Sequence, residues 1–422
     1  MAHVYKGTFL FTPTPWRLTV YEDSYMLVED GLVSAIEPEL PEAWKDKPFT
    51  DFGDRFVIPG FTDLHFHAVQ YVNRGLGHDK PLLEWLEAYT FPEEIRFFDE
   101  EYAKQVFRDV VFDLWQNGTL HSSAYSNISA KTTHLLMDLI EEAGLYAYVG
   151  KVNMDRHGGD LTETTEDSYN ETLRFIEYES ERVKPIITPR FTPACSMRLM
   201  TKLGQLAEEK DLAIQSHLNE TPSEVEWVKE LCPECKDYIE TYTKAGLVRP
   251  YKTIMAHCIY NSKDERARML ELGIFLAHCP SSNTNLTSGV MPVAELLAEG
   301  QRIGLGSDIS GGDQFFMPKV ITEAVKASKL LAVLTDNPEA AIDEVAAFNL
   351  ATRGGGLFFG RRGSFEPGFA FDALVIDDSA LTKYRPLTPT ERLHKWLYLG
   401  KPEQIAERYV DGELVMMPGF AL

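Results

Sequence analysis

Short apolar runs alternate with helical segments over most of this chain. Eight runs have the length and composition of strands, and the segments between them, such as 101–116 and 197–210, carry apolar residues at helical spacing. The predicted strands are 57–65, 119–125, 146–152, 185–191, 212–217, 252–257, 273–278 and 301–308. Because eight strand and helix alternations close naturally into a parallel barrel, we predict an α/β fold, a (β/α)₈ TIM barrel over residues 58–362.

Both ends of the chain have a different pattern. Residues 1–57 contain short β-like runs with turn residues, including the hairpin signal Asp30-Gly31. Residues 363–422 contain similar β-like runs, at 373–377 and 408–417. We therefore predict a small composite β domain, a β-sandwich built from both termini, beside the central barrel.

Polar side chains lie at the carboxyl ends of several of the predicted barrel strands. His65 and His67 end the first strand, His217 the fifth, His257 the sixth and Asp308 the eighth. Residues two apart in a strand share a face, so the first two imidazoles can reach one metal ion. Catalytic groups of parallel barrels gather at the carboxyl ends of the strands, and buried charge needs a partner or a metal. The pattern predicts a metal site, for which Zn²⁺ suits the donors best and Fe²⁺ less well.

Composition and charge narrow the partners. The formal net charge of −23 disfavours nucleic acid and anionic membranes, which are bound through clustered Lys and Arg. Five cysteines are too few and odd in number for a disulfide framework, no signal peptide is recognisable, and no window has the apolar length of a membrane span. We expect a cytoplasmic enzyme that acts on a small molecule.

Four segments that carry these polar strand ends resemble the amidohydrolase superfamily, in its mononuclear deaminase branch. They are PGFTDLHFH, QSHLNE, AHCIY and GSDISGG. The resemblance implies one metal ion, held by four residues: His65, His67, His217 and Asp308. It implies that His257 is not a tight ligand but bonds to the reacting water. No strand-four lysine of the kind that bridges two metals is present, which favours a single ion.

A closer resemblance, to the guanine deaminase family, extends over essentially the whole chain. Its most specific segments are TPRF and LLEWLEAYTFP, supported by HFHAVQY, HCPSSNTNL and GFAFDALVI. This resemblance implies zinc-dependent hydrolysis of guanine to xanthine and ammonia, a place in purine catabolism, and a homodimer.

The chemistry assigns roles to the strand-end residues. Glu220 is placed to protonate a ring nitrogen and later the departing ammonia, Asp308 to accept a proton, and His257 to stabilise the oxygen of the tetrahedral stage. By resemblance, the base is bound by a second set: Gln70, Trp85, Arg190, Phe191 and His217. Arg190 is the expected donor to a purine carbonyl.

Two alternatives remain open on the sequence. One is another deaminase of the same superfamily, acting on 8-oxoguanine, a pterin, cytosine or a chlorotriazine; the other is a barrel without catalysis that serves as a binding or assembly protein. Cys232 and Cys235 have metal spacing but no further ligands nearby, so we interpret them as a fortuitous pair. His278 is interpreted as either a residue that orients a neighbour or a packed core histidine.

Overall fold

Eight parallel strands follow one another around a barrel in the order in which they occur along the chain. The computed structural model describes residues 2–421. The barrel strands are β5 (Phe61–His67), β6 (Thr119–Tyr125), β7 (Tyr146–Gly150), β9 (Val183–Pro189), β10 (Ala213–Leu218), β11 (Thr253–His257), β12 (Phe275–His278) and β13 (Arg302–Leu305), with the short β8 (Val152–Asn153) beside β9. The first and last strands meet where the Asp308 N–H donates to the His65 carbonyl at 2.8 Å and the His67 N–H donates to the Ile309 carbonyl at 2.9 Å. These bonds close the ring at the carboxyl ends of the strands.

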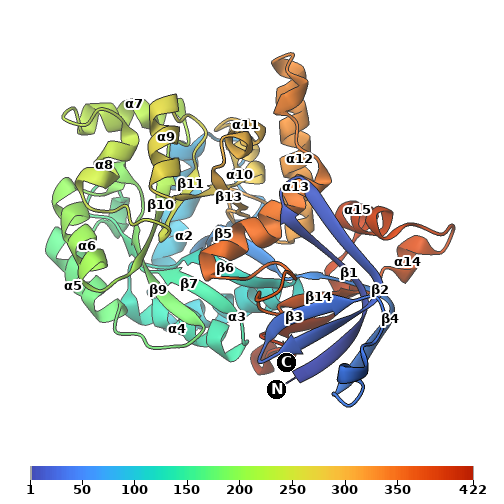
Figure 1. Ribbon diagram of the computed structural model, residues 1–422. Helices are drawn as coiled ribbons and strands as arrows, with labels where there is room; N and C mark the ends of the chain where they lie inside the picture. The colour runs from blue at the N-terminus through green and yellow to red at the C-terminus, as the bar shows by residue number, and fades with distance from the viewer. Residues whose placement is uncertain (1, 422) are drawn as a thin grey trace.

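Helices surround the barrel (Figure 1). The longer connections carry α3 (Glu100–Gln116), α4 (Ala130–Glu142), α5 (Thr165–Phe175), α6 (Met197–Glu209), α7 (Pro222–Leu231), α8 (Tyr238–Lys244), α9 (Lys263–Glu271), α10 (Pro280–Asn285), α11 (Val293–Ala298), α12 (Met317–Leu334) and α13 (Glu344–Asn349). Side-chain caps begin several of them, with complete capping boxes at Thr221 for α7 and Ser262 for α9. Between residues 2 and 421, no helix combines the length and the apolar character that a membrane crossing requires.

The two ends of the chain come together in one sheet of seven strands. Its order is β16 (Glu413–Leu414), β15 (Ile405–Val410), β14 (Ala373–Ile376), β4 (Phe49–Pro59), β1 (Ala2–Thr14), β2 (Arg17–Glu29) and β3 (Leu32–Glu37). All neighbours are antiparallel except β1 and β4, and blue and red strands lie side by side in Figure 1. The short helices α14 (Ser379–Thr382) and α15 (Pro389–Leu399) lie between β14 and β15. The predicted fold class, a barrel with a small β domain from both termini, is confirmed; the strands of that domain form one continuous sheet, where a sandwich has two packed sheets.

Most strands begin or end within a few residues of their predicted bounds, but the first predicted strand is divided between two sheets. The run 57–65 is not a single strand: Val57 belongs to β4 of the terminal sheet, and the barrel strand β5 begins at Phe61. Gly60 separates them at a close approach, because a Cβ there would lie 2.3 Å from Leu120 Cδ1. Apolar residues continue through this junction on both sides, so the hydrophobic pattern carries no sign of the break.

A buried carboxylate joins the terminal sheet to the barrel. Asp372, just before β14, accepts a hydrogen bond from His121 Nε2 on β6 at 2.8 Å and one from Arg362 Nη1 at 2.6 Å. Its other oxygen accepts the Asp411 N–H at 2.8 Å, and its carbonyl accepts the Gly60 N–H at 2.9 Å. The side chain of Asp372 thereby joins three segments, and its backbone carbonyl joins a fourth.

Candidate metal centre and active-site pocket

Four predicted metal ligands converge at the carboxyl end of the barrel. His67 Nε2 lies 3.2 Å from His217 Nε2, and Asp308 Oδ1 lies 3.1 Å from His65 Nε2 and 3.6 Å from His67 Nε2. The ligand atoms of His65, His67 and His217 all lie within 4.8 Å of one another, as do those of His65, His257 and Asp308. On distance alone, His257 could therefore also reach an ion at this point.

The donor set fits a divalent cation. His217 Nδ1 pairs with the Arg190 carbonyl at 2.6 Å, which leaves its Nε2 lone pair turned toward the Nε2 of His67. Within the described chain His65 Nε2 makes no hydrogen bond, although Asp308 Oδ1 is close. Buried nitrogen lone pairs that face one another are costly unless a cation lies between them.

Electrostatics keep these groups in the form that binds metal. Burial and the neighbouring imidazoles hold the pKa of His67 and His217 well below the usual value, so both rings are neutral. Burial alone would raise the pKa of Asp308, but the His65 and His257 imidazoles outweigh it and hold that pKa well below its ordinary range. Neutral imidazole and ionised carboxylate are the ligating forms.

Backbone conformation at the strand ends is unusual. His257 has φ 70°, Asp308 φ 49° and Asn219 φ 52°, all in the left-handed region that non-glycine residues rarely adopt. Such conformations persist only where the surroundings impose them, and they gather at functional sites. Here they accompany the turns that aim His257 and Asp308 into the barrel mouth.

Glu220 and His257 face each other beside the ligand cluster. Glu220 Oε2 lies 3.5 Å from His257 Nε2, Glu220 Oε1 accepts a hydrogen bond from Ser288 Oγ at 2.9 Å, and His257 Nδ1 pairs with Asn283 Oδ1 at 2.9 Å. Burial raises the pKa of Glu220 to about 7. Burial would lower the pKa of His257, but the carboxylates of Glu220 and Asp308 raise it above its usual value. Glu220 is therefore placed to exchange a proton near neutral pH, beside an imidazole whose protonated form its carboxylate favours.

A pocket opens directly above this cluster. It encloses about 430 Å³, including its mouth, and its walls include Trp85 from α1 (Leu82–Trp85) and Gln70 from the 3₁₀ segment Ala68–Asn73. Its full lining is His67, Gln70, Leu82, Trp85, Leu86, Arg190, Phe191, His217, Glu220, His257, Leu286, Asp308 and Gly311. Every predicted site residue thus lines one pocket except His65, which lies in contact with Asp308 beneath it.

Sequence reasoning missed Glu94, on α2 (Phe91–Arg96). Arg190 was expected to offer its guanidinium to a ligand, but Nη1 donates to Glu94 Oε2 at 2.7 Å and Nη2 donates to Glu94 Oε1 at 3.0 Å. A signal for the pairing existed, since a buried arginine needs a carboxylate and Glu94 comes two residues after the specific segment LLEWLEAYTFP.

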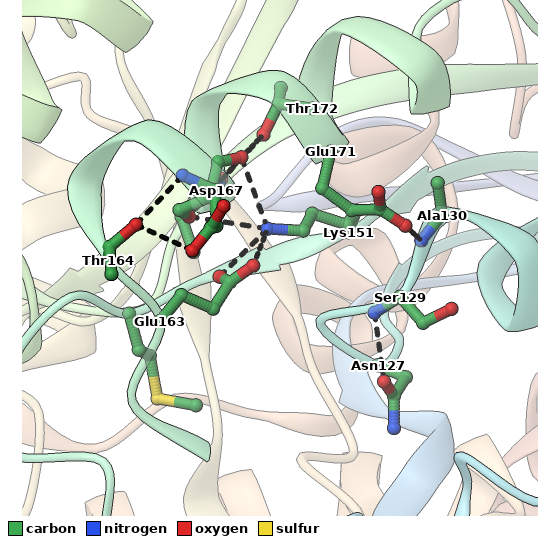
Figure 2. A network of polar contacts seen from close by, with 12 residues as sticks. Asn127, Ser129, Ala130, Lys151, Glu163, Thr164, Asp167, Glu171 and Thr172 are labelled. Atoms are coloured by element: carbon green, nitrogen blue, oxygen red, sulfur yellow. Dashed lines mark hydrogen bonds and ion pairs between the residues drawn. The ribbon is translucent and has the colours of Figure 1, made fainter.

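A buried lysine near the barrel mouth takes no part in the pocket. Lys151 follows β7, and its ammonium donates to both carboxylate oxygens of Glu163, at 3.0 and 2.9 Å, and to Ser168 Oγ at 3.3 Å (Figure 2). Burial lowers the pKa of Lys151 and raises that of Glu163. The ion pair anchors the α5 segment, and Lys151 is not among the residues that line the pocket.

The remaining candidates lie apart from the pocket lining. His278 is fully buried, and burial lowers its pKa to about 3, so the ring is neutral. Cys232 and Cys235 are free thiols, and among residues 2–421 they belong to no group of three or more metal-binding side chains.

Comparison with known proteins places this architecture among hydrolases. The amidohydrolase family profile matches residues 56–415. The chain is 38% identical to the guanine deaminase of Homo sapiens, over 99% of this chain and 97% of that protein, and 30% identical to the guanine deaminase of Escherichia coli, over 94% and 92%. The crystal structure of guanine deaminase from C. acetobutylicum with guanine bound in the active site superimposes with a TM-score of 0.95, at 42% identity, covering 99% of this chain and 100% of that one.

Proposed function

This chain belongs to the amidohydrolase family, and from that membership we propose that its buried pocket hydrolyses guanine to xanthine and ammonia. The observation that carries the proposal is the juxtaposition of Glu220 and His257 with a convergent set of metal-binding side chains. The choice of guanine rests on similarity over nearly the whole chain to guanine deaminases, one of them solved with guanine bound.

We propose Zn²⁺ as the metal, one ion per subunit, with Fe²⁺ as the alternative. Its ligands would be His65, His67, His217 and Asp308, because their nitrogen and oxygen atoms converge and suit zinc. A single ion is supported by the end of the fourth barrel strand, β9, where Arg190 and not a lysine follows Pro189. When bound, zinc supplies a water molecule whose pKa is lowered to about 7.

The protein's own residues then handle the protons. Asp308 accepts one proton from the water as its oxygen adds to C2 of the purine, while Glu220 gives its proton to the adjacent ring nitrogen. His257 donates a hydrogen bond to the added oxygen. Glu220 next carries the remaining hydroxyl proton to the amino group, the C–N bond breaks, and ammonia leaves. A pKa near 7 lets Glu220 both give and take protons at neutral pH.

The pocket walls supply the contacts for a flat, polar base. Arg190 keeps N–H groups that Glu94 does not occupy, and these can donate to the purine carbonyl, while Gln70 reaches the polar edge. Phe191 and Trp85 flank the ring, with Trp85 fixed by its Nε1 bond to the Leu76 carbonyl at 3.0 Å. His217 contributes both to the metal site and to the pocket wall.

The wider setting is proposed from family membership. We propose that the protein is a cytoplasmic homodimer in purine catabolism. Five free thiols suit a reducing compartment, and the net charge of −23 suits a partner that is a neutral small molecule. Light scattering of the purified protein measures the assembly directly, and a monomer mass would contradict the dimer.

A substrate panel tests the function. Ammonia release and product formation are measured with guanine, 8-oxoguanine, cytosine and pterin. We expect turnover of guanine to xanthine at a higher kcat/KM than for any other base. Brisk turnover of a different base with none of guanine would assign another deaminase activity, and metal loading without turnover of any base would favour a binding protein.

A further inference from the structure

We propose that Glu94 is a positioning residue that makes the base-binding end of the pocket selective for uncharged purines over anionic ones. It does so by orienting the Gln70 amide and by neutralising the Arg190 guanidinium. The inference rests on the proposed deaminase function and adds to it a residue that does not itself touch the pocket.

The Glu94 carboxylate is completely engaged by pocket side chains. It is 3% exposed, and Oε1 accepts from both Gln70 Nε2 and Arg190 Nη2, each at 3.0 Å, while Oε2 accepts from Arg190 Nη1 at 2.7 Å. Arg190 and Gln70 line the pocket, whereas Glu94 lies behind them. Its influence on a ligand must therefore pass through these two residues.

The first effect concerns the direction of the Gln70 amide. Gln70 Nε2 donates to Glu94, and Gln70 Oε1 accepts the Ser310 N–H at 3.3 Å. A flipped amide would place its oxygen against a carboxylate and its NH₂ against an N–H, so both contacts would become repulsive. Glu94 and Ser310 together leave one amide orientation, and with it one donor and one acceptor face for the base.

The second effect concerns charge. Glu94 and Arg190 form a bidentate pair in which each side chain is 4% exposed. The pair as a whole has no net charge, while the guanidinium still offers its remaining N–H donors to a ligand. The other carboxylates that face the pocket, Glu220 and Asp308, add no attraction for an anion. The lactam edge of a neutral purine can accept hydrogen bonds from these donors. An anionic purine gains no net electrostatic attraction from the neutral pair and is repelled by the Glu94 carboxylate behind Arg190.

The segment that carries Glu94 is itself fixed. Asn127 Nδ2, after β6, donates to the Glu94 carbonyl at 3.0 Å, and the Arg190 guanidinium carbon lies 5.2 Å from the centre of the Phe91 ring on the same helix. Helix α2 therefore holds Arg190 by charge and by ring contact at once, which suits a rigid support for ligand binding.

The test is the substitution Glu94→Gln, measured in the metal-loaded full chain by kcat and KM for guanine and by the inhibition constant of urate, an anionic purine. A glutamine keeps only one of the two acceptor oxygens, so its NH₂ group would face an N–H donor of Arg190. The KM for guanine should therefore rise about 10-fold or more while kcat stays within about 3-fold. Because Arg190 now carries an uncancelled charge, urate should inhibit about 10-fold more tightly. A merely structural role would not tighten the binding of an anion.

The neighbouring carboxylate gives a matched control. Glu93, on the same helix, pairs with Arg96 at 2.9 Å and with Tyr102 and does not line the pocket. Glu93→Gln makes the same change of charge and should leave the KM for guanine and the inhibition by urate unchanged.

The Glu94→Asp variant and the wild type provide two further tests of the proposal. Glu94→Asp keeps the charge but shortens the side chain. It should raise the KM for guanine without tightening urate binding. This variant replaces Glu94→Gln as the test if Glu94→Gln does not fold. Unchanged constants in both variants, or tighter urate binding by Glu94→Asp, would overturn the role of Glu94. If the wild type itself fails to turn over guanine, the proposed function is at fault instead.

Discussion

Burial decides what the carboxyl group of Glu220 can do. An exposed glutamate is ionised at neutral pH and has little tendency to carry a proton. Glu220 is 4% exposed, and burial raises its pKa to about 7, with the His257 imidazole and the Ser288 hydroxyl acting in the opposite direction. The side chain is therefore poised to exchange protons, and it faces the pocket in which a base would lie.

Replacing this group should abolish turnover without preventing binding. Glu220→Gln keeps the shape but removes the titrating proton, so kcat should fall by about 10² to 10⁴ while the KM for guanine changes little. The measurement is ammonia release at saturating guanine. Glu226→Gln is the control, because Glu226 lies on the adjacent helix α7, pairs with Lys229 and is 68% exposed. A Glu220→Gln protein with more than a tenth of the wild-type kcat, about 1.4 kcal/mol of barrier, would exclude this role.

At the scale of elements, Asp372 shows how the terminal sheet is joined to the barrel. Burial would raise its pKa, but the His121 hydrogen bond and the Arg362 guanidinium lower it to about 2, from an ordinary value of 3.8. A carboxyl whose pKa is lower in the folded state than in the unfolded state stabilises the fold above its ordinary pKa. That contribution is lost as the pH falls through the folded value.

Asp372→Asn should therefore destabilise the protein at neutral pH. Removing one partner of a buried ion pair costs about 3–5 kcal/mol, and urea unfolding measures the difference. Between about pH 4 and pH 2 the wild type loses the part of this stability that depends on the ionised carboxylate, so the gap between the two proteins should narrow there. Asp411→Asn is the comparison, since Asp411 is 32% exposed and should cost only about 1 kcal/mol. A gap that stays constant with pH would argue against the linkage.

For the whole molecule, a bound metal would cross-link distant parts of the chain and so stabilise the folded state. Its proposed ligands come from β5, β10 and the segment after β13, the strands at which the barrel begins, passes its middle and closes. An ion that binds only the folded protein stabilises it, by about 4 kcal/mol when its free concentration is a thousand times Kd.

Chelation should consequently lower the Tm as well as abolish activity. Added Zn²⁺ should restore both, and thermal unfolding across zinc concentrations measures the shift. His65→Ala should remove the dependence of Tm on zinc, whereas His134→Ala should keep it, because His134 lies on α4 and bonds to the Phe175 carbonyl. If chelation leaves the Tm of the wild type unchanged, the metal does not stabilise the fold in this way.

Local patterns in the sequence determined the architecture and the polar residues at the barrel mouth. Strand runs such as 273–278 are visible because they are short and apolar. The polar residues at or just beyond the strand ends, such as His217 and Asp308, could be assigned to one rim by the geometry of parallel barrels. Gln70, Trp85 and Arg190 came only from resemblance, since nothing in their spacing distinguishes them from ordinary buried residues.

The tertiary structure alone decided which distant side chains meet. The pairing of Glu94 with Arg190, the bond from Ser288 to Glu220 and the contact of Asp372 with His121 each join residues separated by 68 to 251 positions. The division at Gly60 between two strands also became visible only in three dimensions. Periodicity records how one segment faces the core, but such contacts depend on how helices and loops pack against one another, and that information is not contained in any single segment.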